Sequence, residues 1–207
     1  IFTSIRSTMS RRADKTAVYV SPAVPLLLAV FAVLSSPLLL AALLLAAVGH
    51  ELSHYGMLRL LGAGVSAMRI TVLGAEMEVR GRLSYGGELL AAAAGPAANL
   101  LWAPLLAFCG QWWETAYLFS GAQLILGIFN LLPVLPLDGG RILWHLTAWI
   151  TEPYTADRVA RIISVFTAVL LTLVAAAALW MGGSPFLLLA AAGLLRYTFG
   201  QIGVAKS

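Results

Sequence analysis

Charged side chains are scarce in this chain of 207 residues. Asp, Glu, Lys and Arg together make up 11% of it, whereas hydrophobic residues make up 60% and the mean hydropathy is +0.90. Soluble domains carry about 25% charged residues, so the composition excludes a disordered chain, a collagen-like fibre and an ordinary cytosolic enzyme. It indicates an integral membrane protein. The net charge of +4 is too small to indicate a nucleic-acid partner.

Two further features are scarce or absent: the chain has a single cysteine, and it shows no convincing signal-peptide cleavage site. The single cysteine, Cys109, lies in an apolar run and has no partner for an intrachain disulfide, so we expect it to act as a small buried hydrophobic residue. A basic segment, residues 6–15, precedes the first apolar run, but no convincing small-residue cleavage site follows it. We therefore expect a retained first membrane span rather than a removed leader.

Six apolar runs approach the length of about 20 residues that a membrane-spanning helix needs. They cover residues 20–34, 37–61, 88–109, 116–132, 159–181 and 185–199. We therefore expect an all-α membrane protein of about six transmembrane helices that forms a single domain over residues 1–207. In the third run, Gly95-Pro96 is expected to kink or break the helix.

Basic residues fall on one side of this six-span topology. It places both termini and the 62–87 and 133–158 loops on the same side, and all 13 Lys and Arg residues lie in or beside those segments. The turns on the opposite side, at residues 35–36, 111–115 and 182–184, contain none. Because cytoplasmic loops carry an excess of Lys and Arg, we expect both termini to be cytoplasmic.

One segment, residues 68–83, has the period of a β-strand rather than of a helix. Apolar and polar side chains alternate from Ile70 to Arg80, with Gly74 at the expected turn. The pattern predicts a short membrane-associated β-hairpin, and a polar loop is the alternative.

The second apolar run contains the sequence His50-Glu51-Leu52-Ser53-His54, which is the HExxH pattern. Residues four apart share a helix face, so both imidazoles can bind one zinc ion, and Glu51 can act as a general base that activates water. Histidine and glutamate are costly inside a membrane span, which argues against an idle role, although the histidines could instead satisfy other buried polar groups. His50 lies about 20 Å along the helix from Pro37, which places the metal within the bilayer, nearer the cytoplasmic face.

A catalytic zinc site needs a third protein ligand and an open position for water. The candidates are Asp138, His145 and Glu88. Asp138 is favoured, because a carboxylate at a span end flanked by glycines can approach the metal closely. Helix N-capping is the alternative role for Asp138, and an interhelical polar contact is the more common role for a residue such as His145.

Three motifs together resemble a known protein family. HELSH in a membrane helix, Ala94-Gly95-Pro96-Ala97-Ala98-Asn99, and the stretch from Asn130 to Gly140 (NLLPVLPLDGG) resemble the site-2 proteases, which are intramembrane zinc metalloproteases. The NLLPxxPLDGG form with six spans is most similar to the sporulation stage IV metalloprotease, which processes a sigma-factor precursor. The resemblance covers about residues 20–200.

The resemblance implies a role for each matching residue. It implies zinc ligation by His50, His54 and Asp138, activation of water by Glu51, substrate binding through Asn130, and a substrate loop shaped by Pro133 and Pro136. It also implies that the hairpin accepts an extended substrate by β-addition. The sporulation enzyme carries a C-terminal nucleotide-binding domain of the cystathionine-β-synthase type, and we expect none here.

The expected function is that of an intramembrane zinc endopeptidase acting in regulated intramembrane proteolysis. The expected partners are a membrane-associated protein substrate, such as a sigma-factor precursor, and the lipid bilayer, with membrane inhibitor or regulatory proteins as further candidates. Two alternatives stay open at this point. One is a non-catalytic membrane scaffold that retains a zinc site, and the other is a metal transporter, which would need ligands at several depths.

Overall fold

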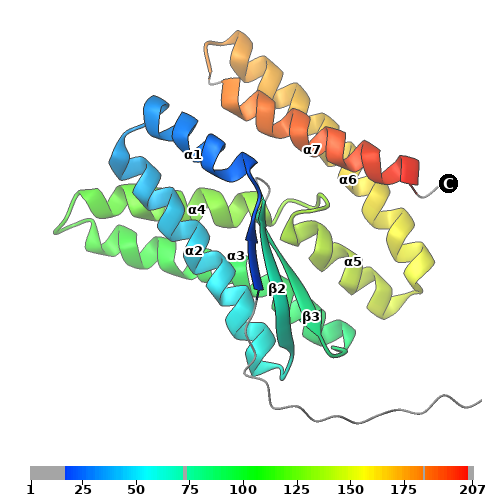
Figure 1. The fold of residues 1–207 in the computed structure, drawn as a ribbon. Coiled ribbons are helices and arrows are strands. Elements are labelled where there is room, and N and C mark those ends of the chain that lie inside the picture. Colours follow the sequence, from blue (N-terminus) through cyan, green and yellow to red (C-terminus); the bar gives the residue numbers. More distant parts are fainter. Residues whose placement is uncertain (1–16, 72–73, 184, 205–207) are drawn as a thin grey trace, which may run out of the picture.

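The computed structural model describes residues 17–71, 74–183 and 185–204. Seven helices and three strands follow one another along these residues (Figure 1). Their bounds are β1 Ala17–Val20, α1 Ala23–Leu34, α2 Pro37–Leu60, β2 Gly64–Thr71, β3 Gly74–Arg80, α3 Tyr85–Cys109, α4 Thr115–Asn130, α5 Asp138–Ile150, α6 Pro153–Trp180 and α7 Pro185–Val204.

Three of these helices, α2, α3 and α6, are long and apolar enough to cross a membrane. Ala23–Leu34 and Leu187–Gly200 are shorter apolar helices, and α4 has 16 residues. Each of the six expected spans therefore corresponds to a helix, but among the described residues three helices are both long and apolar enough to span, and the count of six stays a prediction. The 133–158 loop of the expected topology contains the additional helix α5.

Serine caps begin the two helices that carry the candidate site. The Ser36 side chain accepts a hydrogen bond from the backbone N–H of Leu39 at the start of α2, and Ser84 does the same for Gly87 at the start of α3. Of the expected kink or break at Gly95-Pro96, the break is wrong, because helix α3 continues through Pro96, and the kink stays a prediction. Pro96 is buried between helices, and prolines are tolerated within apolar helices of this kind.

The expected hairpin is present as β2 and β3, which pair antiparallel from Gly64↔Arg80 to Thr71↔Gly74. Gly74 has a φ of +126°, which favours glycine at this position. Residues 72–73 of the expected turn lie outside the described residues. Strand β1, which we did not expect, pairs parallel to β2 and makes a three-stranded sheet in the order β1-β2-β3. Val20, expected at the start of a span, instead ends β1.

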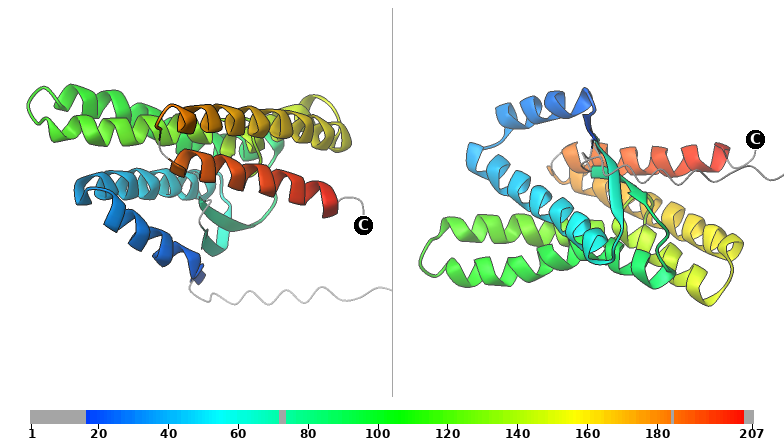
Figure 2. Two further views of the ribbon diagram at one scale, coloured as in Figure 1. Left: turned by 90° about the horizontal axis from the view of Figure 1, so that it is seen from above. Right: turned by 60° about the horizontal axis from the view of Figure 1, so that its bottom comes forward.

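Small residues allow the helices to pack closely around α2. Ala42 and Ala46 on α2 and Ala122 on α4 form one buried cluster. Figure 2 shows α2 between α1 on one side and the α3–α4 pair on the other. Helix α6 packs against both α5 and α7. Val134 and Leu137, in the loop before α5, form a second cluster with residues of α6 and α7. This packing brings α2, α3 and the start of α5 together.

Candidate metal centre

Helix α2 presents its two histidines on one buried face. His50 and His54 are 5% and 7% exposed, whereas Leu52 between them is 61% exposed. The rings of His50 and His54 lie edge to face, with centroids 4.6 Å apart. The Nε2 atoms of the two rings are 3.0 Å apart. The spacing of four residues thus places both side chains as the HExxH pattern predicts.

Asp138 completes a cluster of three ligand atoms. Its Oδ2 lies 2.9 Å from Nε2 of His50 and 3.0 Å from Nε2 of His54, and its side chain is buried. These residues form the group of His, Cys, Asp and Glu side chains that is placed to hold a metal ion among the described residues. His145 and Glu88, the other candidates for third ligand, are not part of it. Leu137, and not Asp138, occupies the N-cap of α5, so the capping alternative is wrong.

Two glycines allow Asp138 to reach this position. A Cβ on Gly139 would lie 2.1 Å from the carbonyl oxygen of Leu131, and one on Gly140 would lie 2.6 Å from the backbone nitrogen of Leu135. Loop 131–137 therefore packs directly against the first turn of α5. The glycines that flank Asp138 thus act by allowing the loop to fold back, rather than by direct approach to the metal.

Hydrogen bonds fix how the histidines present their nitrogen atoms. Nδ1 of His54 lies 2.7 Å from the carbonyl oxygen of Ala91, which can only accept, so Nδ1 carries the proton. Nδ1 of His50 lies 2.6 Å from Oδ1 of Asn99. The unprotonated Nε2 atoms then face each other and a carboxylate oxygen. Three acceptors in van der Waals contact repel one another unless a cation lies between them, so the donor set fits a divalent metal.

Gly95 supplies the space for such an ion. It lies on α3 opposite the histidines, and a Cβ at this position would lie 2.3 Å from Nε2 of His54 and 2.7 Å from Nε2 of His50. The sequence analysis placed Gly95 in an expected kink and in the Ala94–Asn99 motif, but it assigned neither Gly95 nor Asn99 a role at the metal. The position of Gly95 four residues before Asn99, on the same face of a helix, is the signal that could have linked both residues to the site.

The charge state of Asp138 suits a metal ligand. Nη1 of Arg141, one turn further along α5, lies 3.5 Å from Oδ1 of Asp138. A cation at this distance favours the ionised carboxylate that metal binding requires.

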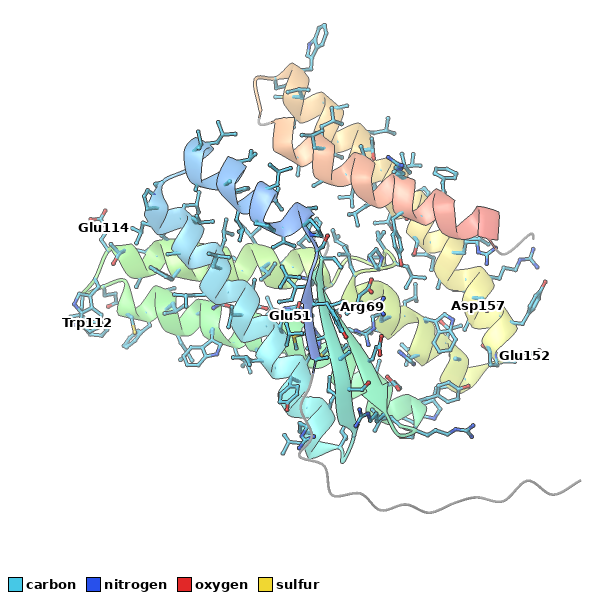
Figure 3. The ribbon with its side chains drawn as sticks, in the orientation of Figure 1. Glu51, Arg69, Trp112, Glu114, Glu152 and Asp157 are labelled. Atoms are coloured by element: carbon cyan, nitrogen blue, oxygen red, sulfur yellow. The ribbon has the colours of Figure 1, made fainter. Side chains whose placement is uncertain are left out.

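Glu51 lies beside the metal cluster, between α2 and the sheet (Figure 3). Its Oε1 accepts a hydrogen bond of 3.1 Å from the backbone N–H of Ala75, the second residue of β3. The sequence predicted both the glutamate and the hairpin but not their contact. The hydrogen bond holds one carboxylate oxygen, and a carboxylate offers a second oxygen to a proton.

Asn130 and Pro136, the residues predicted to bind substrate, lie outside the metal cluster. Asn130 is the last residue of α4, and its Nδ2 donates to the carbonyl oxygen of Leu126 over 3.1 Å. Pro136 is half-buried in loop 131–137 and follows a cis peptide bond. Both flank the loop that carries Asp138, and their roles toward substrate stay predictions.

Comparison with known proteins points to one class of enzyme. Residues 106–174 match the model of Peptidase family M50. This match includes Asp138 but not the two histidines. A zinc metalloprotease of Methanocaldococcus jannaschii is 30% identical over 101 residues. The aligned region is 45% of this chain, and the chain spans only 30% of the length of that relative.

The fold is similar to that of a solved protease. The site-2 protease from Methanocaldococcus jannaschii superimposes with a TM-score of 0.66 at 21% sequence identity. The superposition covers 85% of this chain and 84% of that chain. Nearly all of the described fold, including helices outside the family match, is therefore shared with that structure.

Proposed function

We propose that this chain is a single-domain zinc metalloendopeptidase of the site-2 type, which cleaves a membrane-associated protein near the cytoplasmic face. The observation that carries the proposal is the convergence of His50, His54 and Asp138, with Glu51 adjacent in sequence. Two histidines and one carboxylate form a typical ligand set of catalytic zinc, which keeps a further position open. The family match and the zinc metalloprotease relative support zinc as the metal.

Each side chain of this site has a separate role in peptide hydrolysis. Bound zinc would polarise the scissile carbonyl and lower the pKa of an attacking water. Glu51 accepts the proton of that water and passes it to the leaving amine. The N–H of Ala75 holds Oε1 of Glu51 in place during both transfers. His50, His54 and Asp138 hold the metal at the depth of the second half of α2.

The free edge of β3 supports binding of an extended substrate. Strand β3 is an edge strand of the described sheet, and the N–H of Ala75 points away from β2, toward Glu51. Backbone groups of a strand alternate between its two edges, so Met77 presents its N–H to the same free edge as Ala75. A peptide that pairs with β3 through Met77 would extend directly toward Glu51. This arrangement exposes peptide bonds that a helical substrate would hide.

The positions of the turns support a membrane orientation with both termini in the cytoplasm. In Figure 1 the α1–α2 and α3–α4 connections lie toward one end of the molecule, the α6–α7 connection lies at the top, and the α5–α6 connection lies toward the other end. Figure 3 shows Trp112 and Glu114 at the first end and Glu152 and Asp157 at the second. The first three connections lack Lys and Arg, as expected for the non-cytoplasmic side.

The substrate class follows from the site's depth and from the resemblance noted above. A membrane-associated precursor of a sigma factor, as in sporulation, is the substrate that we propose to test first. Membrane inhibitor or regulatory proteins are proposed as further partners. A non-catalytic scaffold would keep these partners without cleavage, and it is the alternative that the following experiment tests.

Loss of Asp138 is expected to empty the metal site. The protein purified in detergent without chelators should contain about one zinc per chain, and Asp138→Ala should bind zinc more than about 100-fold more weakly, because it removes a ligand rather than an outer-shell partner. Metal analysis by mass spectrometry measures both. A well-folded parent protein without zinc would contradict the proposed enzyme and favour the scaffold.

Removal of the edge donor at Met77 is expected to weaken substrate cleavage without loss of zinc. Met77→Pro deletes one N–H on the free edge of β3, where proline is tolerated, and should lower kcat/KM about tenfold, the value of one hydrogen bond. Met77→Ala is the matched control, because it loses the same packing against the buried cluster but keeps the N–H. Equal rates for the two variants would contradict pairing at this edge.

A further inference from the structure

Asn99 is a buried amide that joins three helices at the metal centre. Its side chain on α3 is 1% exposed. Its Oδ1 lies 2.6 Å from Nδ1 of His50 on α2. Its Nδ2 donates to the carbonyl oxygen of Ala46, 3.3 Å away on α2, and to Oε1 of Gln123 on α4. All polar atoms of this side chain therefore have partners.

The contact with Ala46 decides which way the Asn99 amide faces. A backbone carbonyl can only accept a hydrogen bond, so the NH₂ group must lie on the side of Ala46 and Gln123. Oδ1 then faces His50 and can only accept, so Nδ1 of His50 carries the proton. A neutral imidazole with a proton on Nδ1 has its lone pair on Nε2. That atom of His50 is the one that faces His54 and Asp138.

We propose that Gln123 and Asn99 form a relay that holds His50 in its metal-binding tautomer. Asn99 is a positioning residue that acts through His50, and Gln123 acts one step further away by holding the Asn99 amide in its orientation. The proposal rests on the proposed metal site. Partners of this kind raise the basicity of a ligating histidine and fix its ring.

The two histidines differ in how they are held. Nδ1 of His54 donates to the backbone carbonyl of Ala91, a partner that no side-chain substitution deletes. His50 depends instead on the Asn99 side chain, which the carbonyl of Ala46 and the side chain of Gln123 hold together. Helix α4 contributes no ligand to the described cluster, so Gln123 influences the metal only through Asn99. Metal affinity should therefore respond to substitutions on a helix that does not touch the metal.

Zinc affinity of the full chain in detergent tests the relay. Dissociation constants are measured by competition with a chromophoric chelator, and the melting temperature of the metal-free protein is measured in parallel. Asn99→Leu should weaken zinc binding about 10–100-fold. Gln123→Met, which removes the acceptor at a half-buried position, should weaken it about tenfold. Gln123→Glu keeps an acceptor oxygen and should retain the parent affinity.

Ser120→Ala is the matched control for a merely structural effect. Ser120 lies on α4 one turn before Gln123, and its Oγ donates to the carbonyl oxygen of Ala103 on α3 over 2.7 Å. The substitution removes a hydrogen bond between the same two helices without contact to Asn99, and it should leave zinc affinity unchanged.

The outcomes separate the relay from the metal site itself. Parent-like zinc affinity in Gln123→Met and Asn99→Leu would overturn the relay while leaving the proposed function intact. An equal loss of affinity in Ser120→Ala and Gln123→Met would also overturn it, because general packing would then explain the effect. A parent protein that binds no zinc would overturn the proposed function and the relay together.

Discussion

Replacement of Gly95 by alanine is expected to abolish metal binding without unfolding the helix that carries it. The added methyl group would lie 2.3 Å from Nε2 of His54 and 2.7 Å from Nε2 of His50. Neither ring can move away freely, because Ala91 and Asn99 hold the Nδ1 atoms. We expect a loss of zinc affinity beyond the roughly 100-fold that is typical of outer-shell substitutions, measured by chelator competition.

Gly56→Ala provides the matched control for this substitution. Gly56 lies on α2 two residues after His54, and a Cβ there would have no heavy atom within 4 Å. Alanine is the strongest helix former, so metal-free Gly56→Ala should melt at or above the parent temperature. Metal-free Gly95→Ala should keep its helices but melt below the Gly56→Ala protein, because its methyl group displaces a histidine ring. Parent-like zinc content in Gly95→Ala would show that the metal does not lie between the histidines and α3.

Glu51→Gln is expected to abolish cleavage while zinc remains bound. Glutamine has nearly the same shape as glutamate, and its amide oxygen can still accept a hydrogen bond from the backbone N–H of Ala75. It cannot accept the proton of the attacking water, so kcat should fall about 10²–10⁴-fold, the usual contribution of a general base. The assay measures cleavage of a membrane-associated substrate in detergent or proteoliposomes, with zinc content determined on the same sample.

Measuring cleavage and zinc content on the same sample distinguishes a wrongly assigned base from a loss of the metal. Full activity of Glu51→Gln would contradict the assignment of the base. A loss of zinc in the same variant would instead mean that Glu51 supports the metal. Asp138→Ala should lose both zinc and cleavage, so the two variants are expected to differ in metal content but not in residual activity.

Local features of this protein could be predicted from the sequence because they depend on neighbours along the chain. Composition and apolar runs predicted the helices, since insertion in a membrane requires long apolar segments. A spacing of four residues predicted that His50 and His54 share a face. Alternation with a period of two predicted the pairing of β2 with β3. Helix bounds were less well determined: α4 ends at Asn130, two residues before the end of the expected span, and α6 begins at Pro153, six residues before the start of the expected one.

Contacts between distant segments required the tertiary structure. Asp138 was the favoured third ligand among three candidates, and only the folded loop 131–137 shows that it, rather than His145 or Glu88, reaches the histidines. The pairing of β1 with β2 joins residues about 50 positions apart, a distance over which no local period operates. The contact of Ala75 with Glu51 connects a strand to a helix in the same way.

The sequence by itself thus determined the membrane character of the chain, the approximate positions of six of the seven described helices, and the local pattern of the candidate base and two candidate ligands. The tertiary structure decided what surrounds them. Gly95 and Asn99 are a small residue and an amide in an apolar helix, and nothing in their own segment distinguishes space for an ion from close helix packing. That distinction depends on which atoms of α2 and α4 lie opposite, and it exists only once the helices have packed.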